Sequence, residues 1–485
     1  MPWTLPEAAS QQPVITGRTI TTDGSAGYFH DQFGNPRLWV ATETWGLFTN
    51  AGQNSGGDWQ GDFDAFFSAR AAQGFTVCML SPYWTGGGSA TRDTGDTWDG
   101  LTPLAGGSTD PSSAGLNPTF WARVDSMMAS ALSNGITIGF VLINPGDDLE
   151  AGHWQDSWTT TQWQDFAEMV AARYAAQINV VWLYGNDMFS PYSDTQLKAV
   201  RAGVAAAGAT QIISAWYNAE TTSRYVTDTN ATEDWGVSYA DFNFCYTYNC
   251  GYWVVEYAWT EVSAQGAASL LPPIWGDGYF SQEDSGAGYD ATYSRAMRQE
   301  WWWTLASGAR GILGEAENVY PWVSGSAAAV TGDWFFANNA PKIVSYFTSL
   351  PEWYKLVADT SSVLVTAGRG TKAPGLASGG GGGQYEPAFS NNYVAVSITP
   401  DQSLAVLYLP AHTTVTIDQA RLPAGYSATW VDPITCATAA AATGTTYNST
   451  TQGTNSQGDP DWVLVLQAAP RVVRPATGLL LVGII

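Results

Sequence analysis

Short apolar runs alternate with longer amphipathic stretches over roughly the first 355 residues of the chain. The runs are rich in β-branched and aromatic residues, which is typical of strands buried on both faces. They predict strands at 37–42, 75–80, 136–143, 178–187, 211–217, 242–248, 273–277 and 310–313. Apolar residues at helical spacing between them predict helices at 58–73, 120–133, 161–176, 193–207, 253–265, 289–306 and 333–349.

Strands that alternate with helices form a parallel sheet with helices on its outside. A doubly wound open sheet is one arrangement of this kind, but no G-x-G-x-x-G motif follows the first predicted strand. Eight repeats are instead the pattern of a closed barrel. The sequence therefore predicts an α/β fold, a (β/α)8 TIM barrel.

The pattern changes near residue 356. Glycine-rich sequence and then short alternating segments follow, separated by Pro, Gly and Asn turns, which predicts an antiparallel β-sandwich. The expected strands are 393–398, 404–409, 413–417, 427–431 and 462–466. The predicted organisation is an N-terminal extension (1–27), a barrel (28–355), a β-sandwich domain (356–470) and an apolar C-terminal tail (471–485).

Composition narrows the class of partner. The net charge is −24, which argues against nucleic acid and anionic membranes, because phosphate binding needs clustered Lys and Arg. Only 13% of the residues are charged, and 24 are Trp, more than a core of this size needs. Aromatic surfaces that pack on sugar rings are a common use of such a surplus. An uncharged carbohydrate handled outside the cell fits this composition.

Metal and redox chemistry find little support in the sequence. The cysteines, Cys78, Cys245, Cys250 and Cys436, form no C-x-x-C pair, and there are three histidines, so we expect no metal site and no cofactor. Cys245 and Cys250 either form a disulfide or remain thiols, and we favour reduced thiols. Residues 1–10 lack a signal-peptide pattern, and the apolar segment 478–485 is too short to span a bilayer.

Carboxylates follow several of the predicted strands. They are Glu43, Asp147, Asp148, Asp187, Asp277, Glu315 and Glu317. Each taken singly is equally explained as a helix cap, but in a barrel the C-terminal ends of all strands meet at one mouth. Carboxylates close together shift each other's pKa and provide an acid beside a base, which acetal hydrolysis requires. The motifs of serine hydrolases, P-loop enzymes and zinc proteases are absent.

The same loops carry aromatic and amide side chains. Each aromatic residue alone is more often a core residue than a sugar platform, but as a set at one mouth they favour a carbohydrate groove. The candidate substrate-binding residues are Glu43, Trp45, Tyr83, Trp84, Asn144, Trp154, Asn186, Tyr246, Glu315 and Trp322.

Several blocks of the chain resemble the apiosidase-like glycoside hydrolases, and they occur in the family's order. They are 28–39 with 42–48 (TETWGLF), 70–77 (RAAQGFTV), 173–187 with its NVVWLYGND strand, and the closing block 309–322. In the C-terminal part, 430–433 (WVDP) and 461–466 (DWVLVL) resemble the small β-domain of a collagen-binding type that often follows the family's barrel. The resemblance spans most of residues 28–467.

The resemblance implies a retaining glycosidase with Asp187 as acid/base and a nucleophile at the end of the seventh strand. There the family usually has Gly-Glu-Pro, and this chain has Gly276-Asp277-Gly278; Glu43 stands where the family usually has Asp. The reach of each carboxylate differs by one methylene, so the family's sugar specificity, apiose in particular, is not carried over.

Together these observations predict a glycoside hydrolase that cleaves a polysaccharide or envelope glycan, with Asp187 as general acid/base, Asp277 as nucleophile and Glu315 as the reserve nucleophile. The alternative is a phage tail or other glycan-binding structural protein with little turnover. We expect action outside the cell, either on a virion or after secretion. The tail 471–485 is expected to be an extra strand, a homo-oligomer contact or a docking peptide for virion assembly.

Overall fold

The computed structural model of the chain describes residues 27–31, 33–84, 95–143, 155, 157–188, 194–217, 221–222, 240–247, 251–264, 271–278, 293–316, 319–372 and 391–468. The expected N-terminal extension up to residue 26 and the apolar tail lie outside these residues, as do Asn144, Asp147, Asp148 and Trp154. Among the described residues, none of the helices combines the length and apolar character that a bilayer crossing requires.

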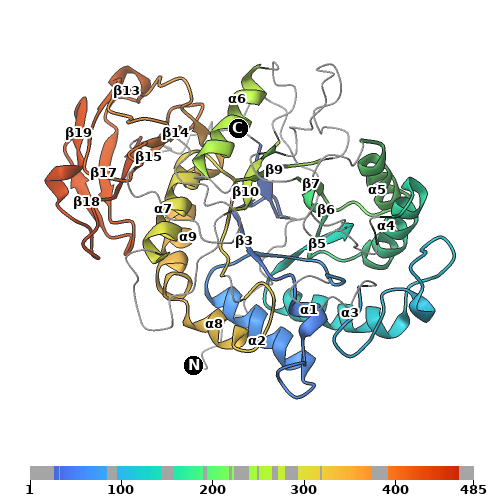
Figure 1. Cartoon of the computed structure of the whole chain (residues 1–485). Helices are drawn as coiled ribbons and strands as arrows, with labels where there is room; N and C mark the ends of the chain where they lie inside the picture. Colours follow the sequence, from blue (N-terminus) through green and yellow to red (C-terminus); the bar gives the residue numbers. More distant parts are fainter. Residues whose placement is uncertain are drawn as a thin grey trace, which may run out of the picture.

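The N-terminal part is the predicted barrel (Figure 1). In the described residues, its parallel strands are β3 (Trp39–Glu43), β4 (Val77–Leu80), β5 (Thr137–Ile143), β6 (Val180–Met188), β7 (Ile213–Tyr217), β9 (Asn243–Tyr246), β10 (Pro273–Asp277) and β11 (Gly311–Leu313). Their order is β7-β6-β5-β4-β3-β11-β10-β9, and a short antiparallel strand β8 (Thr221–Thr222) borders β9. Near the remaining gap, the Asp241 N–H donates to the Ile213 carbonyl at 2.7 Å, so the ring is nearly closed and the TIM-barrel prediction is confirmed.

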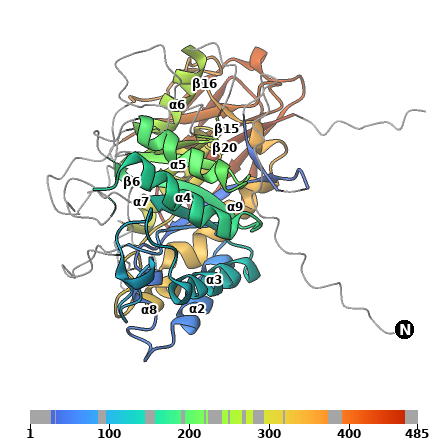
Figure 2. The same cartoon turned by 90° about the vertical axis from the view of Figure 1, so that its right-hand side faces the viewer.

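Helices cover the outside of this sheet. They are α2 (Trp59–Ala72), α3 (Pro118–Ser133), α4 (Thr160–Tyr174), α5 (Asp194–Ala206), α6 (Tyr252–Ala264), α7 (Tyr293–Ala306), α8 (Ser326–Gly332) and α9 (Ala340–Ser349), with a short α1 (Leu47–Asn50) after β3. Figure 2 shows α4 and α5 side by side on one flank. The single helix predicted over 333–349 is interrupted, because a π-turn over Phe335–Asn339 precedes α9 and Pro341 occupies the first turn of α9.

The barrel interior is a packed core. A Cβ on Gly139 would lie 2.9 Å from Met79 and one on Gly311 would lie 2.7 Å from Ile274, so small residues make room for large ones. At the N-terminal end, Phe29 of the hairpin β1 (Phe29–His30)–β2 (Pro36–Arg37) packs on Trp39, with ring centroids 5.4 Å apart. This end of the barrel is therefore plugged by aromatic side chains, and chemistry is left to the opposite end.

The C-terminal part consists of two antiparallel sheets. The six-stranded sheet has the order β12-β14-β15-β20-β17-β18, and the three-stranded sheet has the order β13-β16-β19 in the described residues. Their strands are β12 (Val357–Ala358), β13 (Val365–Ala367), β14 (Ala395–Ile398), β15 (Leu404–Leu409), β16 (Thr414–Ile417), β17 (Ser427–Val431), β18 (Thr438–Ala441), β19 (Thr446–Asn448) and β20 (Trp462–Gln467). The predicted β-sandwich is thus confirmed.

The central strands β14, β15 and β20 of the six-stranded sheet are largely buried on both faces. In β15, Leu404, Val406 and Tyr408 belong to the core shared with the barrel helices, whereas Ala405 and Leu407 belong to the core between the two sheets. Figure 1 shows this domain lying against α7 and α9. On α7, the indole N–H groups of Trp302 and Trp303 donate to the carbonyls of Pro433 and Tyr393 at 2.9 and 2.8 Å. The contact between the domains is therefore a continuation of the core.

Candidate active site

The carboxylates that the sequence singled out lie at one end of the barrel. Glu43 is the last residue of β3, Asp277 is the last residue of β10, and Glu315 follows β11 by two residues. Because the strands are parallel, these positions share the C-terminal mouth, where barrel enzymes carry their active sites. The side chains are only 1%, 3% and 0% exposed, respectively, so their charges are largely removed from water.

Two tryptophans connect two of these carboxylates. The Trp45 indole N–H donates to Glu43 Oε2 at 3.1 Å, and the Trp216 indole N–H donates to Asp277 Oδ2 at 3.1 Å. The two indole rings pack on each other, with centroids 5.0 Å apart and a tilt of 48°. A hydrogen bond donated to a carboxylate favours its ionised form, which opposes the effect of burial at both side chains.

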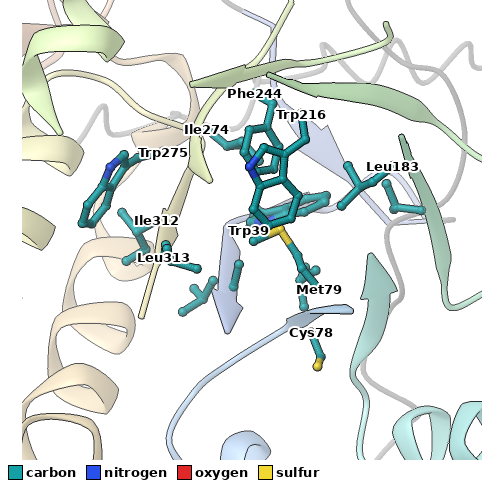
Figure 3. Packing of buried hydrophobic residues seen from close by; sticks show 14 of the residues in the cluster. Trp39, Cys78, Met79, Leu183, Trp216, Phe244, Ile274, Trp275, Ile312 and Leu313 are labelled. Carbon is teal, nitrogen blue, oxygen red and sulfur yellow. The ribbon is translucent and has the colours of Figure 1, made fainter. Parts of the chain in front are cut away.

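Trp216 did not figure among the sequence-based candidates. It lies in β7, whose apolar sequence predicted a strand and nothing more. Figure 3 shows its indole inside the barrel beside Phe244, and the two rings stack with centroids 4.7 Å apart. An aromatic residue one position before the end of a barrel strand is the sequence feature that would have suggested it.

The third carboxylate, Glu315, lies near a buried cation. Arg70 of α2 is fully buried, packs over the rings of Phe66, Phe75 and Phe336, and donates to Gln73 Oε1 at 2.9 Å. Burial lowers the pKa of Arg70 to about 10, while the negative charges of Asp333 and Glu315 act in the opposite direction. Arg70 thus remains a cation and offsets part of the negative charge at the mouth.

The pKa of the Cys78 thiol in β4 responds to the same charged groups. Burial raises the pKa of its thiol well above the ordinary value, Arg70 opposes that rise, and Glu43 and Glu315 add to it. Cys78 is fully buried and carries a free thiol. A thiol kept protonated in this way is a packing residue and not a nucleophile.

The glycines on either side of Asp277 are required by packing. A Cβ on Gly276 would lie 2.4 Å from Phe244 Cζ, and one on Gly278 would lie 2.5 Å from the Thr247 carbonyl oxygen. Both distances are far below van der Waals contact. The backbone that carries Asp277 therefore approaches β9 more closely than any other residue type allows.

The predicted aromatic platforms are placed as follows. Tyr83 is buried, and its hydroxyl donates to the Val141 carbonyl at 2.8 Å. Trp84 is buried beside Tyr320, with ring centroids 6.2 Å apart, and the buried Trp322 lies edge-on to Phe66 at 5.6 Å. Tyr246 is the last residue of β9 and pairs in register with Asp277. Of these four, Tyr246 is therefore the one placed directly beside a candidate catalytic carboxylate, and the sugar-binding roles stay predictions.

The remaining candidates are located only by their backbone or not at all. Asn186 and Asp187 lie in β6, one and two residues after the glycine at 185 and close to the C-terminal end of the strand. Their backbone is thus at the same mouth, and the catalytic role of Asp187 stays a prediction. Asn144 and Trp154 lie outside the described residues. Among the residues that are described, no group of three or more His, Cys, Asp or Glu is placed to hold a metal ion.

Comparison with solved structures supports the fold. A glycoside hydrolase family 5 protein from Bacteroides vulgatus ATCC 8482 superposes with a TM-score of 0.66 at 15% identity, over 92% of this chain and 93% of that one. A second structure, described as a glycoside hydrolase, gives a TM-score of 0.68 at 13% identity, over 95% of this chain and 98% of that one. At these identities the likeness concerns the fold, and it extends through both domains.

Comparison of the sequence identifies the family. No curated protein matches the chain. Residues 25–357 match the family model described as "Apiosidase-like, catalytic domain", and the match ends where the C-terminal sheets begin. Since it covers well over half of the 485 residues and contains the barrel with its carboxylates, the chain belongs to the apiosidase-like family and is a glycoside hydrolase.

Proposed function

We propose that this glycoside hydrolase cleaves a polysaccharide or envelope glycan by a retaining mechanism, with Asp277 as the nucleophile and Asp187 as the general acid/base. The observation that carries the proposal is the position of Asp277. Its carboxylate is buried at the barrel mouth and accepts a hydrogen bond from Trp216 at 3.1 Å. A nucleophile must be ionised at working pH, and a donated N–H favours that state in a site removed from water.

The reaction has two steps. In the first, an Asp277 oxygen attacks the anomeric carbon while Asp187 gives its proton to the leaving oxygen, so the glycosidic bond breaks and a glycosyl ester forms. In the second, Asp187 takes a proton from water, whose oxygen attacks the same carbon and releases Asp277. Two inversions give net retention, and both carboxyl groups return to their starting states.

Glu43 and Glu315 fit a supporting role around the sugar. Both are buried at the same mouth, and Glu43 is fixed by Trp45. Carboxylates accept hydrogen bonds from sugar hydroxyls, and such contacts strengthen as charge develops in the transition state. Glu315 is also the alternative nucleophile, because it follows the strand next to β10 in the barrel.

The test is hydrolysis of a panel of glycans by wild type and by Asp277→Asn, Asp187→Asn and Glu315→Gln. Plant pectic, arabinan-type and bacterial wall glycans are incubated with each, and released reducing ends are measured. We expect Asp277→Asn to be inactive but folded and still able to bind the glycan that the wild type cleaves. Proton NMR of the fresh product should show the anomeric configuration of the substrate.

Three results would change the assignment. An active Asp277→Asn variant beside an inactive Glu315→Gln variant would move the nucleophile to the residue after β11. A product of inverted configuration would make one carboxylate a base that activates water. A wild-type protein that binds a glycan and releases no reducing ends from it would favour the glycan-binding structural protein instead.

A further inference from the structure

The mouth of the barrel contains a continuous chain of contacts that joins two carboxylates. It runs from Glu43 to Trp45, across the indole pair to Trp216, and on to Asp277. Trp45 follows β3 and Trp216 lies in β7, and three strands separate these two in the sheet order. In a ring of eight strands they stand on opposite sides. The indole pair therefore spans the interior of the barrel between the two carboxylates.

Trp216 is also linked to the backbone that carries Asp277. The Trp216 ring also stacks on Phe244, with ring centroids 4.7 Å apart and a tilt of 29°. The Phe244 ring lies directly against Gly276, where a Cβ would be 2.4 Å away. Figure 3 shows Phe244 beside the Trp216 ring. The side chain of Asp277 is thus held by the Trp216 N–H, and the backbone before it lies against the Phe244 ring that stacks on Trp216.

The hydrogen-bond partner separates Trp216 from tryptophans that only pack. Trp182 and Trp322 donate to the side-chain oxygens of Gln211 and Asp62 at 3.3 and 3.4 Å, but several other buried indoles in the described residues donate to backbone carbonyls. They include Trp121 to Pro103, Trp163 to Gln155, Trp259 to Ser307, Trp301 to Leu313, Trp302 to Pro433 and Trp303 to Tyr393. A packing residue needs only such a carbonyl. Trp216 donates instead to a buried carboxylate at the reacting end of the barrel.

We propose that Trp216 is a positioning residue of the glycosidase reaction, whose N–H holds the Asp277 carboxylate in place at the barrel mouth and favours its ionised form. The inference rests on the proposed role of Asp277 as nucleophile. In this role Trp216 acts through its hydrogen bond to Asp277. Its loss should therefore slow formation of the glycosyl ester and change the pH at which Asp277 becomes active, while the fold remains.

The experiment compares Trp216→Phe and Trp216→His with the control Trp121→Phe, using the 4-nitrophenyl glycoside that the wild type hydrolyses fastest in a panel of pentosides and hexosides. Trp121→Phe removes an equally buried indole whose N–H donates to a carbonyl at 2.8 Å outside the site. We expect Trp216→Phe to lower kcat by about 10²- to 10³-fold, the cost of losing one preorganised donor. The acid limb of kcat/KM should move to higher pH, because the pKa of Asp277 rises when the donor is lost.

The two Trp216 variants separate hydrogen bonding from packing. Phe fills more of the apolar space than His, so a packing role predicts a more active Phe variant. A donor role predicts a more active His variant at pH 8, where the neutral ring still carries one N–H. Each variant is first shown to melt cooperatively, and a Phe variant that does not is replaced by Trp216→Leu in the same comparison with His.

The outcomes distinguish this inference from the proposed function. If Asp277→Asn is inactive but Trp216→Phe behaves like Trp121→Phe in kcat and in the acid limb, the positioning role is overturned and the nucleophile stands. A Phe variant more active than the His variant overturns it equally. If Asp277→Asn remains active, Asp277 is not the nucleophile, whatever the Trp216 variants show. The positioning role of Trp216 is then overturned with it, because it rests on that assignment.

Discussion

Arg298 and Asp461 form an ion pair without solvent exposure between the barrel helix α7 and the start of β20, with Arg298 Nη2 2.9 Å from Asp461 Oδ1. Arg298 also contacts Asp459 at 2.9 Å, and Asp461 accepts hydrogen bonds from Tyr408 and Asn455. Burying charges is costly unless every partner is present. This cluster therefore ties the two domains together at one fixed position.

Removing the arginine should destabilise the whole protein. Arg298→Met leaves the fully buried Asp461 without its paired cation and leaves Asp459 with Arg295 alone. We expect the free energy of unfolding to fall by about 3–5 kcal/mol. Arg421→Met is the matched control, because the Arg421–Asp418 pair is 49% and 41% exposed and should contribute about 0–1 kcal/mol. Denaturant unfolding measures both. Equal decreases in the free energy of unfolding for the two variants would show that the interdomain pair contributes no more to stability than an exposed pair.

Gly276→Ala tests the close approach of β10 to β9. The new methyl group would collide with Phe244 at 2.4 Å, so the strand or the Phe244 ring that stacks on Trp216 must shift, at a cost of about 1–3 kcal/mol. The shift displaces the neighbouring Asp277. We therefore expect kcat to fall even at temperatures where the variant is fully folded, so that unfolding does not account for the decrease. Gly115→Ala is the control, since nothing lies within 4 Å of its added Cβ. Unchanged kcat in Gly276→Ala would show that the site tolerates movement of this strand.

The role of Asp187 is tested through the leaving group. General acid catalysis contributes about 10²–10⁴-fold to rate, and we expect Asp187→Asn to lose that factor with poor leaving groups. Activated aryl glycosides need little protonation and should lose much less in the first step. The dependence of kcat/KM on leaving-group pKa should therefore become steeper in the variant. The same loss with every leaving group would assign the acid to another side chain.

Cys436 predicts a pH dependence at alkaline pH. Burial, followed by the charge of Asp432, raises the pKa of its thiol from 9.0 to about 12. The folded state thus holds a proton that the unfolded state releases above pH 9, so this group's contribution to stability is complete below pH 9 and is lost as pH rises toward 12. The free energy of unfolding of the wild type minus that of Cys436→Ser, measured between pH 8 and pH 12, should show that decline.

Alkylation gives a second readout of Cys436. At pH 8 its thiolate fraction should be roughly a thousandfold below that of an ordinary thiol, because each pKa unit changes the fraction tenfold. Iodoacetamide should therefore label Cys436 slowly in the folded protein and readily after unfolding, as mass spectrometry of the peptides would show. Fast labelling of the folded protein would mean that the thiol is not held in this way.

The sequence predicted the barrel well because its strands are buried on both faces. Runs such as 136–143 and 178–187 contain few polar residues, and each is bounded by a helix of clear period. The missed strands are short or carry small and polar residues. In β18 (Thr438–Ala441), for example, the side chains are mostly exposed, so no alternation marks it. Such strands are defined by pairing with β17, which a local pattern does not contain.

The site was predictable in position and less so in its internal contacts. Strand ends located Glu43, Asp277 and Glu315, because parallel strands bring their ends together. The link between Trp45 and Trp216 depends on two strands on opposite sides of the ring, far apart in sequence. Tyr83 was predicted to be a sugar-binding residue because it lies in a loop after a strand. In the structure its ring is buried and its hydroxyl donates to a backbone carbonyl of β5.

The burial of the central strands β14, β15 and β20 on both faces of the six-stranded sheet restricts how the C-terminal domain meets other molecules. One face is covered by barrel helices and the other by the three-stranded sheet. A ligand therefore cannot lie flat on these central strands. It must approach along a sheet edge, through the loops, or from the outer side of β13, β16 and β19. Because the domain is fixed to α7, a ligand bound to the C-terminal domain keeps a constant distance and direction to the mouth of the barrel.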